Sequence, residues 1–170
     1  MINIEYNRRA AVDYANRWAL SRNPAFYDYT GIGGDCTNFA SQVVYAGCGV
    51  MNYTPDTGWY YIDANNKSPS WTGVQFFYDF MINNEGIGPY GEERNLRGLL
   101  PGDIIQLGDR GGNFYHTLIL TDIIRLPGGR FYYIAAHSMD AYRRNLLSYD
   151  FETYRGIHIL GARIEDSFNE

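Results

Sequence analysis

The sequence has few cysteines and no long apolar run. Only two of its 170 residues are cysteine, which is too few for a disulfide framework or a four-cysteine zinc site. Its apolar runs are only a few residues long, whereas a membrane-spanning helix needs about 20. The first residues have neither a basic start nor an apolar stretch, so they predict no signal peptide. We therefore expect no membrane insertion, and either a cytoplasmic protein or an exported domain that lacks its leader.

Positive charge is also scarce. The chain has 14 basic and 19 acidic side chains, which gives a net charge of −5, and Lys67 is its single lysine. An acidic chain without basic runs lacks the electrostatic features of a nucleic-acid-binding protein. We therefore expect no nucleic acid among its partners.

Aromatic residues, by contrast, are abundant: the chain has 16 tyrosines, 9 phenylalanines and 3 tryptophans. Tyrosine at this density suits a polar groove that holds sugars or peptides, although we expect most of these rings to lie half-buried at the edge of the core. Hydrophobic residues make up 45% and charged residues 19% of the chain. Residues 1–170 are therefore expected to form a single domain with a sizeable core.

The order of the predicted elements indicates an α+β fold, with N-terminal helices packed on an antiparallel sheet. Apolar residues at helical spacing predict helices over residues 7–20, 36–46 and 72–81. Thr72 and Gln75 have the spacing of a capping box at the start of the third helix, and the glycine-rich segment 86–91 is expected to be a turn. Apolar and β-branched runs predict strands over residues 104–107, 113–124, 130–137 and 157–164, with a hairpin turn over residues 126–129.

Cys36 is the strongest candidate for a catalytic side chain. Asp35 is a good N-cap residue, so Cys36 is predicted at the first position of its helix, directly after the glycine-rich segment 31–34. A helix N-terminus stabilises a thiolate, and a glycine loop offers backbone N–H groups to an oxyanion. The alternative is a buried structural thiol. Cys48 lies about 18 Å further along the same predicted helix, so the two cysteines are too far apart for a disulfide.

Two histidines are candidates for a catalytic base and its orienting group. His116 lies on the apolar face of a predicted strand. If the following hairpin loop has an even number of residues, Arg125 pairs with Arg130, and His137 falls on the same face as His116. An odd loop would place the two histidines on opposite faces. The third histidine, His158, lies between two isoleucines and is expected to be structural or at the surface.

Other catalytic chemistries lack a matching pattern. The sequence contains no H-E-x-x-H, no paired C-x-x-C and no G-x-S-x-G, the motifs of zinc and serine hydrolases. Zinc could still be bound by His116, His137 and a carboxylate, but their spacing does not call for it. Hydrolysis by a carboxylate pair stays open, because 19 acidic residues always offer pairs. We expect no metal and no cofactor.

Several segments resemble one protein family. Residues 34–42 (GDCTNFASQ) resemble the nucleophile motif of the putative amidase domain family, which belongs to the papain-like cysteine hydrolases near the NlpC/P60 and CHAP cell-wall enzymes. Residues 6–11 resemble the start of that family, and residues 100–106 (LPGDIIQ) resemble the strand entry that these enzymes share. Residues 115–117 (YHT) and 136–138 (AHS) resemble their histidine strand and third-residue strand. The similarity covers nearly the whole chain.

The resemblance implies a papain-like core in which a cysteine on a central helix faces a histidine on the sheet. It implies Cys36 as nucleophile, His116 as base and His137 as the group that orients the base. Asp140 and Asn145, just beyond the strand of His137, are alternatives for the third residue.

The function implied is that of a bacterial thiol hydrolase. It would cleave an amide bond in a peptide or a cell-wall muropeptide through an acyl-enzyme on Cys36. Asp35 would help to position the incoming peptide, and Trp59, in the long surface loop 49–70, would supply an aromatic contact beside the cleft. Two alternatives are a catalytically inactive module that binds glycan or peptide, and a structural domain that docks a partner through the aromatic segment 59–61.

Overall fold

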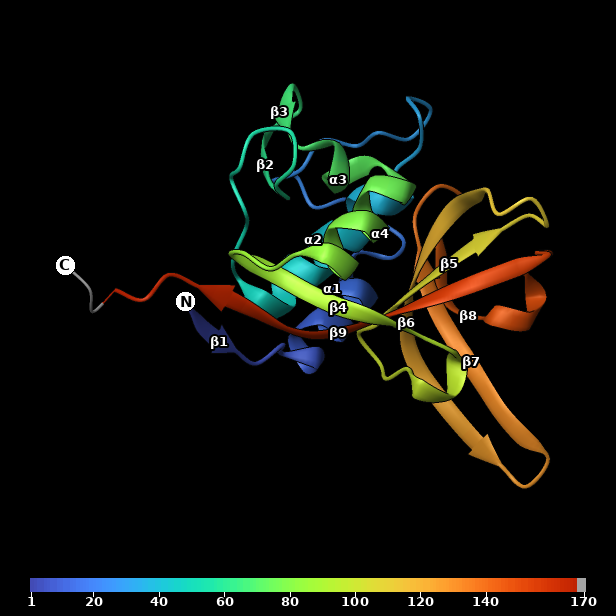
Figure 1. The fold of residues 1–170 in the computed structure, drawn as a ribbon. Helices are drawn as coiled ribbons and strands as arrows, with labels where there is room; N and C mark the ends of the chain where they lie inside the picture. The colour runs from blue at the N-terminus through green and yellow to red at the C-terminus, as the bar shows by residue number, and fades with distance from the viewer. Residues whose placement is uncertain (168–170) are drawn as a thin grey trace.

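Helices pack on one side of an antiparallel sheet (Figure 1). The structure is a computed structural model that describes residues 1–167. Its helices are α1 (Arg8–Trp18), α2 (Cys36–Cys48), α3 (Pro69–Thr72) and α4 (Val74–Asn83), with 3₁₀ turns η1 (Leu96–Gly98) and η2 (Leu146–Ser148). Its strands are β1 (Ile2–Ile4), β2 (Tyr61–Asp63), β3 (Asn66–Lys67), β4 (Gly88–Arg94), β5 (Ile104–Gly108), β6 (Phe114–Leu126), β7 (Gly129–Ala136), β8 (Ala141–Asn145) and β9 (Thr153–Ile164). The α+β prediction is therefore confirmed, as are the three long helices and the four predicted strands.

The main sheet has the strand order β1-β9-β5-β6-β7-β8, and β4 also pairs with β9. All of these pairs are antiparallel. One core lies between the helices and the sheet, where Phe39 of α2 packs near Ile119 and Ala135. A second apolar cluster, with Leu118 and Ile134, lies on the other face of the same strands. Figure 1 shows the β6–β7 hairpin extending beyond the helices.

Almost all residues of helix α2 are buried, which shows that this helix lies in the middle of the helical layer. It begins after Asp35 and ends at Gly49, whose φ of 69° suits a glycine that closes a helix. Cys36 and Cys48 are therefore the first and last residues of one helix, and both are free thiols. The predicted separation of the two cysteines is confirmed.

Two local predictions are wrong. Thr72 does not begin the third long helix: it ends the short α3, and Gly73 then leads into α4 without a side-chain cap. The predicted turn over residues 86–91 instead leads into β4, which pairs with β9. A Cβ at Gly91 would lie 2.5 Å from the His158 carbonyl oxygen, so the close approach of the two strands requires glycine there.

Within the described residues, no helix is both long and apolar enough to cross a membrane.

Candidate active site

Cys36 begins α2, and no side chain caps the start of this helix. Within residues 1–167, the backbone N–H groups of Cys36 and Thr37 have no hydrogen-bond acceptor. Gly33 and Gly34, just before the helix, have φ values of 80° and 98° that few other residues could adopt. The chain thus presents a thiol together with free N–H groups, which is the arrangement that can hold a developing oxyanion.

Asp35 occupies the N-cap position, as predicted, but its carboxylate accepts no hydrogen bond from the backbone N–H groups of the helix. Its Oδ1 accepts from the Tyr29 backbone N–H (2.9 Å) and from Asn38 Nδ2 (2.8 Å). Its Oδ2 lies 2.6 Å from His137 Nδ1 and 3.7 Å from Arg22 Nε. Because only 1% of Asp35 is exposed, it cannot contact an incoming peptide, and the expectation that it binds substrate is corrected.

His137 is fully engaged inside the protein. Its Nε2 lies 2.7 Å from the Trp18 carbonyl oxygen, and its ring stacks on Phe39 at a centroid distance of 3.8 Å. A carbonyl oxygen only accepts, so Nε2 carries a hydrogen, and the short bond from Nδ1 to Asp35 holds a second proton. With both nitrogens occupied, His137 cannot orient His116, and this expectation is also corrected. His137 instead ties the end of α1 to the start of α2.

The reason for this difference is a β-bulge. The predicted hairpin register is present, since Arg125 pairs with Arg130. The register shifts between Leu120 and Asp122, however, because one extra residue is inserted in β6. A one-residue shift moves a side chain to the other face of the sheet. His137 therefore faces the helices, whereas His116 shares the opposite face with the second apolar cluster.

His116 lies beside Tyr149, with a centroid distance of 5.9 Å between the rings. Burial, with a smaller contribution from the Arg144 charge, lowers the pKa of His116 from 6.5 to about 4. The imidazole is therefore neutral near pH 7 and can accept a proton. Among residues 1–167 the hydrogen bonds include none to the His116 ring, so neither of its nitrogens is committed to a protein partner.

The first turn of α2 is joined to β6 next to His116. The Thr37 and Thr117 hydroxyl oxygens are 2.9 Å apart, and each residue directly follows its candidate catalytic neighbour. The Cys36 sulfur has the Thr37 hydroxyl as its partner, at 3.8 Å. No hydrogen bond of the described residues joins the Cys36 sulfur to His116. The structure thus brings the two segments together without a thiol–imidazole bond.

The two alternatives for the third residue also have other partners. Asp140 accepts two hydrogen bonds of 2.9 Å from Arg22. Asn145 accepts from the Leu147 backbone N–H at the start of η2. His158 has the structural role that was one of the two expected for it. Its Nδ1 lies 2.7 Å from Asp103 Oδ2.

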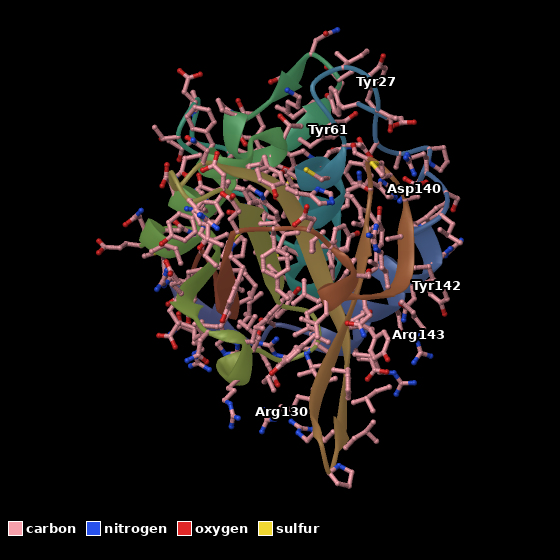
Figure 2. The ribbon with its side chains drawn as sticks, turned by 90° about the vertical axis from the view of Figure 1, so that its right-hand side faces the viewer. Tyr27, Tyr61, Arg130, Asp140, Tyr142 and Arg143 are labelled. Atoms are coloured by element: carbon pink, nitrogen blue, oxygen red, sulfur yellow. The ribbon has the colours of Figure 1, made fainter. Side chains whose placement is uncertain are left out.

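Trp59 does not line a cleft. It is fully buried, donates from Nε1 to the Ser41 hydroxyl (3.1 Å) and packs against Trp71 at 4.7 Å. The expectation that Trp59 binds substrate is therefore corrected: its ring fills the core beside α2. Figure 2 shows two other aromatic residues, Tyr27 and Tyr61, toward the same end of the molecule as Asp140.

Sequence reasoning missed two residues beside the nucleophile. Ser138 accepts from the Asp35 backbone N–H at 2.6 Å, and it begins a turn in which it and Met139 have φ values of 59° and 71°. Arg22 lies 3.2 Å from Asp28 as well as contacting Asp35 and Asp140. A two-residue turn usually carries glycine or asparagine at such φ values, so the sequence offered no signal for Ser138.

Two further observations limit the chemistry of the site. In the part of the chain that the structure describes, no group of three or more His, Cys, Asp or Glu side chains could hold a metal ion.

Cys48, at the other end of α2, is a poor nucleophile because burial raises its pKa to about 11.

Comparison with known proteins agrees with the resemblance of the motifs. Residues 5–160 match the family described as "Putative amidase domain". The chain is 32% identical over 119 residues to "Uncharacterized protein YhbB" of Bacillus subtilis (strain 168), a match that covers 68% of this chain and 37% of that relative. The chain thus corresponds to little more than a third of the relative's length. No solved structure matches. The family match covers most of the chain, and the chain belongs to the putative amidase domain family.

Proposed function

We propose that this domain is a thiol hydrolase that cleaves an amide bond in a peptide or a cell-wall muropeptide, with Cys36 as nucleophile and His116 as base. The observation that carries the proposal is the position of Cys36 at the uncapped start of a buried helix, directly after a glycine loop. A papain-like fold and a relationship to the NlpC/P60 and CHAP enzymes belong to the same proposal. They are supported by membership of the amidase family and by the order of the motifs.

The assignment of the base follows from the partners of the three histidines. His137 and His158 are each held by a buried carboxylate at 2.6 Å and 2.7 Å. His116 is the histidine that has no such bond among residues 1–167, so its ring nitrogens are available to the thiol. Catalytic hydrogen bonds are often long in a ligand-free enzyme and shorten when substrate binds. The His116 imidazole lies on the sheet face opposite the helices, so the proposal requires a movement that brings it to the Cys36 thiol in the substrate complex.

The chemistry has two steps. In the first, His116 takes the proton of the Cys36 thiol, the sulfur bonds to the amide carbon, and the N–H groups of Cys36 and Thr37 stabilise the oxyanion. The carbon–nitrogen bond then breaks, and the imidazolium gives its proton to the leaving amine. In the second step, water attacks the resulting thioester, releases the acid and restores the thiol. The sequence of steps needs no cofactor.

The test is incubation of the protein with muropeptides and with casein, followed by mass spectrometry for new amine and acid termini. We expect new termini with the parent protein and none with Cys36→Ala, and an acyl adduct on Cys36 in the intact mass of the parent protein. Undiminished hydrolysis by Cys36→Ala would overturn the proposal.

The absence of a Cys36–His116 hydrogen bond among the described residues favours a second candidate, an inactive module that binds glycan or peptide. Binding of the muropeptide by the parent protein, with no new termini and slow modification of Cys36, would support that candidate instead.

A further inference from the structure

We propose that a directed chain of buried hydrogen bonds, which begins at Arg155 and ends at the Cys36 sulfur, stabilises the thiolate of Cys36. This inference rests on the proposed function and deepens it, because it concerns the ionised form of the same nucleophile. In this chain of hydrogen bonds, Thr37 is a positioning residue that supplies a hydrogen bond to the Cys36 sulfur.

The chain follows a row of residues across three strands. Arg155 of β9 pairs in register with Gln106 of β5, which pairs in turn with Thr117 of β6. Side chains directly opposite in neighbouring strands lie on the same face of the sheet, here the face that carries α2. Arg155 Nε donates to Gln106 Oε1 (2.8 Å), Gln106 Nε2 donates to Thr117 Oγ1 (3.2 Å), and Thr117 Oγ1 lies 2.9 Å from Thr37 Oγ1. All four side chains are buried.

The direction of the chain is set by the arginine. A guanidinium group only donates, so the oxygen of the Gln106 amide must face Arg155 and its nitrogen must face Thr117. Thr117 therefore accepts from Gln106, and its own hydrogen is free to point to Thr37. The Thr37 hydroxyl, having accepted, can donate to the Cys36 sulfur at 3.8 Å. A thiolate can only accept, so ionisation of Cys36 completes the alignment of every donor in the chain.

The head of the chain carries a positive charge. The Arg155 guanidinium lies between the rings of Tyr78 and Phe114, at 3.6 Å and 3.9 Å from their centroids, and its Nη2 donates to Gln75. Burial lowers the pKa of Arg155, but an arginine side chain stays charged in proteins. A buried charged donor polarises the bonds that follow it, and this strengthens the last bond of the chain.

Other ionisable groups near the start of α2 are Asp35, which contacts both His137 and Arg22, and Asp28 and Asp140, which contact Arg22. On the sheet, His116 is the titratable residue next to Thr117, and its ring packs on Tyr149. These groups lie outside the chain of hydrogen bonds, so removal of the Thr37 hydroxyl leaves their bonds intact.

The test measures the rate of iodoacetamide alkylation of Cys36 against pH, by peptide mass spectrometry, in full-length variants. Thr37→Val keeps the shape of the side chain and removes the hydroxyl. We expect the midpoint of its pH–rate profile to move upward by about one pH unit, which is a tenfold loss of rate at pH values below both midpoints. Thr37→Ser retains the hydroxyl and should keep the parent profile.

A matched control is Thr121→Val on the same strand as Thr117. Thr121 is buried, and its hydroxyl bonds the Tyr133 carbonyl oxygen outside the chain, so its profile should not move. If Thr37→Val does not fold by circular dichroism, Thr117→Val replaces it and should move the midpoint in the same direction. An unchanged profile in the folded variant, or an equal shift in Thr37→Ser, would overturn the inference. Alkylation does not depend on turnover, so hydrolysis that survives Cys36→Ala would refute the proposed function separately.

Discussion

The two ends of α2 carry the same residue with the same exposure, 8%, and yet their chemistry differs. At the start of the helix, Cys36 lies beside free backbone N–H groups and the Thr37 hydroxyl. At the end, the Cys48 sulfur donates to the Val50 carbonyl oxygen (3.4 Å), and burial raises its pKa to about 11. The first sulfur has a hydroxyl group as its partner, whereas the second meets a carbonyl oxygen. Burial accounts for the high pKa of Cys48, whereas the start of a helix and the Thr37 hydroxyl offer Cys36 the donors that a nucleophilic thiol needs.

Removing the sulfur at either end gives the largest contrast. Cys36→Ala should reduce amide hydrolysis by a factor on the order of 10⁴ or more, because a covalent mechanism loses its nucleophile. Cys48→Ala should leave the rate within about twofold, since this thiol takes no part in the chemistry. Initial rates on muropeptide measured by chromatography check both values. Similar losses in the two variants would contradict the assignment.

Removing the base should have the next largest effect. His116→Gln should lower the rate of hydrolysis by about 10²- to 10⁴-fold, the usual contribution of a general base. Tyr115→Phe is the matched control, because Tyr115 is an exposed neighbour on the same strand, and it should change the rate by less than about twofold. If His116→Gln hydrolyses the substrate as fast as the parent, then His116 is not the base and another group takes that role.

Among these substitutions, loss of the buried Asp35–His137 contact before Cys36 should have the largest effect on stability. Asp35→Asn leaves His137 without its carboxylate partner, and breaking a buried pair costs about 3–5 kcal/mol in the free energy of unfolding. Asp140→Asn removes a carboxylate from the same Arg22 at a partly exposed position, where the cost should be below about 1 kcal/mol. Urea unfolding followed by circular dichroism measures both. Equal costs would mean that Asp35 is as dispensable as Asp140.

The lowered pKa of His116 predicts a smaller, pH-dependent effect. Between pH 6.5 and about 4, the unfolded chain binds a proton at His116 that the folded protein does not. Stability therefore falls as pH drops through this window, by up to ~3 kcal/mol from this residue. His116→Gln should flatten the curve of unfolding free energy against pH by that amount, relative to the parent. A curve parallel to that of the parent would show that His116 is not desolvated.

The sequence predicted the elements whose patterns are strong. The helices that contain Ala15 and Cys36, and the strands on either side of the 126–129 turn, follow from apolar spacing and turn residues. The N-cap position of Asp35 was also predictable from its residue type. These features are local, so a short window of sequence specifies them.

The arrangement of the candidate site was less predictable because it depends on tertiary contacts. One extra residue in β6 reverses the face on which His137 lies, and nothing in the sequence near Thr121 marks this bulge. Trp59 was expected beside the cleft, but the Ser41 hydroxyl of α2 holds its ring in the core. The partner of Asp35 lies 102 residues away in the chain, and no local pattern indicates it.

The most direct test of the central claim compares Cys36 and Cys48 within one molecule. The native protein would be treated with iodoacetamide at pH 6 to 7, and the modification of each cysteine followed over time by peptide mass spectrometry. Because the two residues have equal exposure, we expect Cys36 to react at least about 100-fold faster, since the start of a helix stabilises a thiolate and its end does not. Equal rates at the two ends of α2 would contradict it.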